Sequence, residues 1–246
     1  MSLTKIALTP VAVAILIAAA VSCGGSGTEE VTPTAASTPE PTATPVNPQA
    51  ALEMSGRVME ETGTFHFRLH HESGSMELTP GLLIEDIEGD IVKPDTLSVS
   101  FKGSAGGIAI RASIITLGAS AYMTNPLTGA WEAGPTGTSP LGFFDPSLGI
   151  AAMMQEVSQV RLLGADPDDR TAYSIAGLLP ASALAPLVGA TLEESTVSVE
   201  MTIDSRSLYL LEVRIAGRVT PTDVDDVVRV ITLSAFGEPV SIKAPL

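Results

Sequence analysis

Cysteine and aromatic residues are scarce in this sequence. Of its 246 residues, one is cysteine and 4% are aromatic. A single thiol cannot form a disulfide within the chain, so no disulfide framework stabilises the fold. With few aromatic side chains, the core must be built mainly from aliphatic residues and methionine, of which there are eight. Methionine suits irregular or variable apolar surfaces.

Positive charge is also scarce. The chain has 13 lysines and arginines against 28 aspartates and glutamates, which gives a formal net charge of −15. A chain this acidic is repelled by the phosphates of nucleic acid and by anionic lipid headgroups. We therefore expect no nucleic-acid partner, and we expect that contact with a membrane depends on a covalent anchor rather than on a basic patch.

The common catalytic motifs are absent. The sequence contains no G-x-S-x-G, no H-E-x-x-H, no phosphate-binding Walker loop and no G-x-G-x-x-G. The three histidines, His66, His70 and His71, lie on one predicted strand. His66 and His70 share a face about 13 Å apart, and His70 and His71 point to opposite faces, so neither pair can chelate one metal alone. We expect solvated histidines, no cofactor and no enzyme activity.

Two acidic clusters resemble collections of calcium ligands. One is Asp166–Asp169 with Pro167 inside it, and the other comprises Asp223, Asp225 and Asp226. Neither follows the EF-hand spacing, and both fall where turns are expected. We therefore interpret them as solvated turn carboxylates and predict no metal site.

The start of the sequence has the pattern of a secretion signal. Lys5 precedes an apolar stretch from Val11 to Ala20, which is shorter than the roughly 20 residues that a membrane-spanning helix needs. The small residues Ala20 and Ser22 lead to Cys23, which resembles the bacterial lipobox. We expect residues 1–22 to be a lipoprotein signal peptide and Cys23 to carry the lipid that anchors the chain to the extracytoplasmic face of the cell membrane.

Residues 23–49 are dominated by proline, threonine, serine and alanine. Such a segment cannot bury enough apolar surface to fold, and its prolines favour an extended conformation. We expect a linker that separates the anchor from a single domain over residues 50–246, which is long enough to bury a substantial core.

Within this domain, alternating or apolar runs between glycine and proline clusters predict mostly strands. The predicted strands are Thr64–Glu72, Asp95–Lys102, Ile108–Ile115, Ala119–Thr124, Val157–Leu163, Thr171–Leu178, Ser195–Asp204, Ser207–Ala216 and Val228–Phe236. Helices are predicted at Pro48–Glu61, from Asp145 to about Val157, and at Ala181–Val188, with Asp145-Pro146 as a helix start. Many strands with few helices favour an antiparallel sheet covered on one face.

Several apolar side chains share a face of a strand or helix and are candidates to line either a filled core or an apolar cavity. Composition alone leaves these two alternatives open. The candidates are Phe65, Phe67, Leu69, Leu97, Val99, Phe101, Ile108, Ile110, Ile150, Met153, Met154 and Val157.

Five segments occur in an order that is informative: EGDIVKPD (88–95), AYMTNPLTGAWEAGP (121–135), FDPSLGIAAMMQEV (144–157), YSIAGLLPASAL (173–184) and VITLSAFGEPVSIKAP (230–245). In this order, behind a lipobox and a linker, they resemble the LppX/LprAFG family of lipoproteins, known mainly from mycobacteria. The sequence departs from the family in its long Pro/Thr linker and in lacking a tryptophan at Asp204–Leu208.

The resemblance implies an α+β fold similar to LolA and LppX. That fold is a strongly curved antiparallel sheet, an incomplete β-barrel, with a few helices covering its concave face. Between the sheet and the helices the family has an apolar cavity that binds acyl chains.

We therefore expect a membrane-anchored lipoprotein that binds lipids or acylated glycolipids and carries or transfers them across the cell envelope. A membrane exporter is a candidate partner. The alternative is an envelope sensor or interaction lipoprotein that uses the same fold to control a protein partner.

Overall fold

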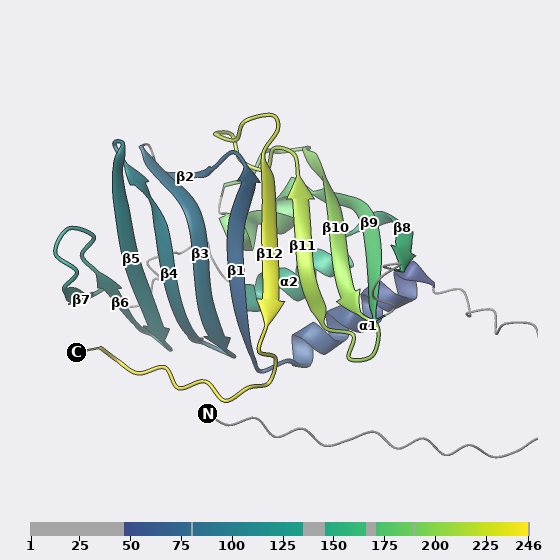
Figure 1. Ribbon diagram of the computed structural model, residues 1–246, viewed down its shortest axis with the longest axis horizontal. Helices are drawn as coiled ribbons and strands as arrows, with labels where there is room; N and C mark the ends of the chain where they lie inside the picture. Colours follow the sequence, from purple (N-terminus) through teal and green to yellow (C-terminus); the bar gives the residue numbers. More distant parts are fainter. Residues whose placement is uncertain (1–46, 80, 135–145, 166–170, 189, 246) are drawn as a thin grey trace, which may run out of the picture. The chain divides into compact units, whose positions relative to one another are not determined.

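The computed structural model describes residues 47–79, 81–134, 146–165, 171–188 and 190–245 (Figure 1). The helical elements are α1 (Pro48–Glu61), α2 (Pro146–Gln155), a 3-10 turn η1 (Ala181–Leu184) and α3 (Ala185–Val188). The strands are β1 (Thr64–Ser73), β2 (Met76–Thr79), β3 (Leu82–Val92), β4 (Thr96–Ala105), β5 (Ile108–Leu117), β6 (Ser120–Thr124), β7 (Trp131–Ala133), β8 (Ser158–Ala165), β9 (Ala172–Pro180), β10 (Thr196–Asp204), β11 (Leu210–Ala216) and β12 (Val228–Ser234).

In the described part of the chain, all the strands belong to one antiparallel sheet of 12 strands. Its order is β7-β6-β5-β4-β3-β1-β12-β11-β10-β9-β8, with β2 paired to β3. The first and last strands of the domain, β1 and β12, pair at the centre of the sheet, and β7 and β8 form its two edges. Because β7 and β8 do not pair, the sheet remains an open, incomplete barrel, which confirms the predicted fold class.

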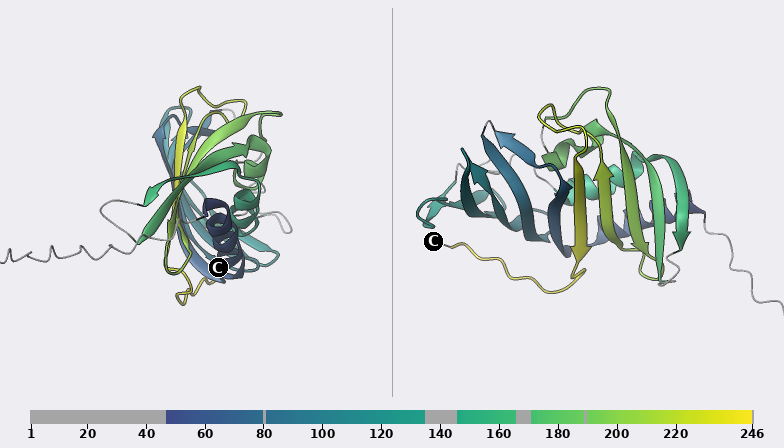
Figure 2. Two further views of the ribbon diagram at one scale, coloured as in Figure 1. Left: turned by 90° about the vertical axis from the view of Figure 1, so that its right-hand side faces the viewer. Right: turned by 45° about the horizontal axis from the view of Figure 1, so that its top comes forward.

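The helices lie on one side of the curved sheet (Figure 2). In Figure 1, α1 and α2 lie behind the half of the sheet that runs from β12 to β8. We call the surface of the sheet on this side the inner face and the opposite surface the outer face. Among the described residues, no helix combines the length and the apolarity needed to cross a membrane.

Helix α1 begins and ends at the residues predicted from its apolar spacing. The side chain of Asn47 accepts hydrogen bonds from two backbone N–H groups of the first turn, and Pro48 occupies the first turn where its missing N–H costs nothing. At the other end, Lys93 Nζ donates to the carbonyl oxygens of Met59 and Glu60, at 2.8 and 3.0 Å. A lysine at these carbonyls offsets the negative end of the helix dipole.

Strand β1 shows how alternation separates the two faces. Phe65, Phe67 and Leu69 are each no more than 2% exposed. On the outer face between them, His66 Nδ1 lies 2.8 Å from an oxygen of Asp90, and Arg68 pairs with Asp86 on β3. The buried residues therefore belong to the inner face, as the period of two along a strand requires.

All nine predicted strands and all three predicted helices are present, with ends that shift by up to three residues. The predicted 181–188 helix starts as a 3-10 turn. β2, β3 and β7 were not predicted from the sequence. The omission of β3 has a physical cause, because its acidic residues disfavour a strand by intrinsic propensity. Pairing with β1 and β4 overrides this propensity, since Asp86 and Asp90 bond Arg68 and His66 on the outer face.

Candidate lipid-binding face

The strand register brings the predicted apolar residues together on the inner face. Phe67 of β1 lies opposite Gly89 of β3, which lies opposite Val99 of β4, which in turn lies opposite Ile114 of β5. The two neighbouring rows have the same register. Leu69 lies opposite Ile87, which lies opposite Phe101. Phe65 lies opposite Ile91, which lies opposite Leu97. Side chains that are far apart in the sequence thus form one apolar surface.

Three residues of the expected lining are less buried than the rest, and one of them, Leu97 of β4, is partly buried against the core. Ile110 is partly buried and packs against the core, but Ile108 is 68% exposed. Ile108 pairs with Ala105 at the end of the β4–β5 hairpin, next to the Gly106-Gly107 turn. Ile108 is on the same face of β5 as Ile110, but it lies at the end of the hairpin, outside the buried part of that face.

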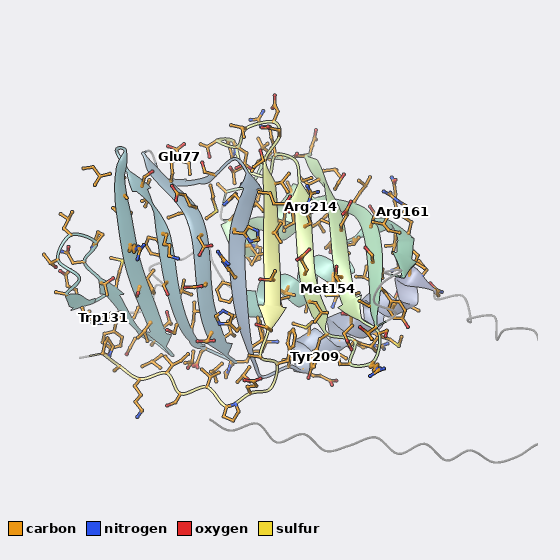
Figure 3. The ribbon with its side chains drawn as sticks, in the orientation of Figure 1. Glu77, Trp131, Met154, Arg161, Tyr209 and Arg214 are labelled. Carbon is orange, nitrogen blue, oxygen red and sulfur yellow. The ribbon has the colours of Figure 1, made fainter. Side chains whose placement is uncertain are left out.

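Helix α2 contributes buried apolar side chains. Ile150, Met153, Met154 and Val157 are between 1% and 6% exposed, and all belong to the same apolar cluster as the inner face of the strands. Met154 is on the helix side of the sheet in Figure 3. A Cβ built on Gly56 of α1 would lie 3.8 Å from Met154 Cβ, so α1 and α2 pack closely at this point.

Two glycines that shape the inner face were not among the predicted site residues. A Cβ on Gly89 would overlap with the carbonyl oxygen of Ser98, and a Cβ on Gly177 of β9 would overlap with the side chain of Val157. Gly177 therefore leaves the space that Val157 fills just after α2. A glycine inside an apolar strand pattern is the signal that could have identified Gly177.

The apolar residues on the second half of the sheet were also not among the predicted site residues. From β9 to β12, residues of the same face are buried to the same degree as those of β1. They include Ile175, Val199, Met201, Val213, Ile215, Ile231 and Leu233. The apolar inner face therefore extends across both halves of the sheet.

A buried ion pair interrupts this apolar surface. Arg229 of β12 is 1% exposed and donates from Nη2 to Asp223 Oδ1 in the β11–β12 loop. Asp223 also accepts from the backbone N–H groups of Val219 and Thr220 and from the Thr220 hydroxyl. The prediction that Asp223 is a solvated turn carboxylate is therefore wrong, since its side chain is 0% exposed in the ion pair.

Hydrogen bonds keep the buried carboxyl of Asp223 ionised. Burial by itself raises the pKa of this carboxyl, but the hydrogen bonds from Arg229 and from the Thr220 backbone outweigh it and hold the pKa below its ordinary value of 3.8. Asp225 fits the prediction of a solvated carboxylate, because its side chain is 95% exposed and lies 3.5 Å from Arg218.

The histidines are less solvated than predicted. His66 is half-buried in its contact with Asp90, and His71 is half-buried on the inner side of β1, opposite Arg229. Burial, and to a smaller extent the charge of Arg229, lowers the pKa of His71 below 6.5. In the described part of the chain no group of three or more histidine, cysteine, aspartate or glutamate side chains could hold a metal ion.

Several of the sequence-based expectations concern residues outside those that the structure describes. They are the signal peptide over residues 1–22, the lipid attachment at Cys23, the linker up to residue 46, the turn cluster Asp166–Asp169, and Asp145 as the residue that starts α2.

A match to a family model shows which protein family the chain belongs to. The model of the LppX_LprAFG lipoprotein family matches residues 47–242. The chain belongs to this family. The match spans every helix and strand described above, and it confirms the resemblance inferred from the order of the sequence motifs.

Solved structures of LppX_LprAFG lipoproteins have the same fold. LprF from Mycobacterium bovis superposes with a TM-score of 0.61 at 16% identity, over 80% of this chain and 96% of LprF. The lipoprotein LppX from Mycobacterium tuberculosis gives a TM-score of 0.53 at 16% identity, over 79% of this chain and 97% of LppX. No curated protein sequence matches the chain. At these identities the structures establish the shared fold.

Proposed function

We propose that this protein is a membrane-anchored lipoprotein that binds lipids or acylated glycolipids against its inner face and carries or transfers them across the cell envelope. The observation that carries the proposal is the continuous apolar inner face of an open sheet, to which α2 adds Ile150, Met153 and Met154, and the residue just after it, Val157, adds its side chain. Membership of a lipoprotein family supports the same function.

The energetics of lipid exchange fit such a surface. Moving one methylene out of water contributes about 0.8 kcal/mol, but an acyl chain in a bilayer is already out of water. A protein that takes up a lipid therefore only has to match the membrane, and the exchange can be nearly balanced. The scarcity of aromatic residues and the presence of methionine suit a surface that accommodates flexible chains.

In this proposal the anchor attaches the domain to the membrane and the linker gives it reach. A lipid on Cys23 would hold the domain at the membrane surface, and the segment between Cys23 and the start of α1 would let it reach donor and acceptor lipids. The high negative charge makes a covalent anchor necessary, because the chain itself is repelled by anionic headgroups.

The experiment substitutes tryptophan for Met153, which is 1% exposed on α2. If the residue borders space for acyl chains, the indole fills that space, so the variant keeps its melting temperature and loses bound lipid. In a filled core the same substitution strains its neighbours by typically 1–3 kcal/mol. Met54→Trp is the matched control, because Met54 is 40% exposed on α1.

The measurement is a thermal melt together with the lipid-to-protein ratio after purification, determined by mass spectrometry. We expect Met153→Trp to remain folded with less lipid and Met54→Trp to resemble the wild type. A destabilised Met153→Trp with unchanged lipid per folded molecule would mean that α2 closes a solid core, and the proposal would fail.

A further inference from the structure

The buried polar group on the inner face has more hydrogen-bonding capacity than the protein uses. We call Arg229, Asp223 and His71 the Arg229 cluster. Arg229 and His71 are direct partners across the β1–β12 pair, and Arg229 shares its face with Ile231 and Leu233 further along β12. The cluster therefore lies on the same surface as the apolar lining, at the start of β12 next to the β11–β12 loop.

Three buried nitrogens of the cluster have no hydrogen-bond partner among the residues that the structure describes. Arg229 uses Nη2 for Asp223, but its Nε and Nη1 are buried without a hydrogen-bond acceptor among the described residues. His71 Nδ1 lies 3.3 Å from the carbonyl oxygen of Glu85, and its buried Nε2 has no partner there either. Unpaired buried donors on a charged group are costly, so this arrangement calls for an explanation.

The polarity of these nitrogens defines what could satisfy them. Arginine nitrogens only donate, so Nε and Nη1 need acceptor oxygens. Since a carbonyl oxygen can only accept, the His71 Nδ1 that faces Glu85 carries the proton, and Nε2 is left as an acceptor for a hydroxyl. A group with carbonyl oxygens and a neighbouring hydroxyl matches both requirements.

The charge of the cluster is already balanced. Arg229 and Asp223 neutralise each other, and His71 stays neutral at neutral pH because burial lowers its pKa. An added anion would leave one uncompensated charge in a buried site, which is expensive. A neutral, oxygen-rich group adds hydrogen bonds without adding charge.

We propose that Arg229 and His71 form a polar subsite for the ester carbonyl and hydroxyl oxygens of a neutral acylglycerol, whose acyl chains lie on the apolar inner face. This proposal rests on the proposed lipid-binding function and specifies which part of the lipid is bound where. Asp223 acts as a positioning residue, because it holds Arg229 through one nitrogen and leaves the other two available.

The test compares the binding of three ligands to the full chain carrying Cys23→Ala, after removal of bound lipid. Dioleoylglycerol has ester and hydroxyl oxygens, dioleoyl phosphatidate adds a negative phosphate, and octadecane has no polar group. The main variant combines Arg229→Met with Asp223→Asn, so that no charge stays buried alone. The control combines Arg214→Met with Glu72→Gln, the corresponding ion pair on the partly exposed outer surface.

A second variant, His71→Leu, removes the acceptor and keeps the ion pair. Hydrogen bonds to a charged donor are strong enough to change a Kd by roughly tenfold or more, and neutral ones by about 2- to 10-fold. For dioleoylglycerol, we therefore expect the Kd to rise roughly tenfold or more in the main variant and about 2- to 10-fold in His71→Leu. Octadecane binding should not change in any variant, and the control should match the wild type for all ligands.

Four other outcomes would each be decisive. Unchanged dioleoylglycerol binding in both variants would mean that the cluster only tethers the loop. Equal losses for dioleoylglycerol and octadecane would assign it a purely structural role. Phosphatidate binding more tightly than dioleoylglycerol, and losing most in the main variant, would make the subsite an anion site. Each of these overturns the subsite but leaves lipid binding intact, whereas a wild type that binds none of the ligands would refute the proposed function itself.

Discussion

Replacing Asp223 by alanine would leave the guanidinium of Arg229 buried without its counter-charge. The side chains of this pair are 0% and 1% exposed, so the guanidinium would lose its counter-charge in a site shielded from bulk solvent. The substitution also removes the acceptor for the backbone N–H groups of Val219 and Thr220. The effect should therefore be large for a change at a loop residue.

Its size follows from the burial of the pair. Removing one partner of a buried ion pair typically costs 3–5 kcal/mol, because the remaining charge is uncompensated. Typical domains have a total stability of about 5–15 kcal/mol. For a domain of about 200 residues each kcal/mol lowers the melting temperature by about 2–4 °C, so even the lower figure corresponds to about 6–12 °C.

The assay is thermal and urea unfolding of the chain in the Cys23→Ala background. Asp225→Ala is the control, since Asp225 is in the same loop but its side chain is 95% exposed, and we expect it to change stability by less than about 0.5 kcal/mol. Combining Asp223→Ala with Arg229→Met should recover part of the loss, because no charge is then left unpaired. If Asp223→Ala unfolds at the same temperature as Asp225→Ala, the reasoning is refuted.

Three further predictions concern other parts of the chain. Gly177→Ala should destabilise the domain by about 1–3 kcal/mol in urea unfolding, because its Cβ would overlap with Val157; Gly63→Ala, whose Cβ meets nothing within 4 Å, should not. Because the pKa of His71 is lowered in the folded protein, the unfolded chain binds a proton first as the pH falls. The free energy of unfolding should therefore decrease below about pH 6.5, and it should decrease less in a His71→Gln variant. The exported full-length protein should partition into detergent and Cys23→Ala should not, and equal solubility of the two would contradict lipid attachment.

Local periodicity explains why so many of the elements were predictable. The ends of α1 at Pro48 and Glu61 follow from its apolar spacing and from a proline at the first helical position. The alternation of Phe65, Phe67 and Leu69 with polar residues identified β1 and separated its two faces. These signals depend on the geometry of a few neighbouring residues, which the sequence contains in full.

Burial of polar residues was not predictable in the same way. Asp223 lies in a turn beside Asp225 and Asp226, and nothing in this local pattern distinguishes it from its solvated neighbours. Its burial follows from the loop folding onto Arg229, and from the position of Arg229 on the inner side of β12. Ile108 is the opposite case, an apolar residue whose strand extends beyond the core.

The sequence by itself determined the helices, most of the strands and the apolar character of one face, because covalent geometry fixes the periods of 3.6 and 2 residues along a chain. The order of motifs also identified the family before any contact was known. Only the tertiary structure decided that β1 pairs with β12, that Gly89 and Gly177 make room on the inner face, and that Arg229 is buried there beside His71. These features depend on contacts between residues as much as 168 positions apart, such as His66 with Ser234, and no local pattern encodes which distant segments meet.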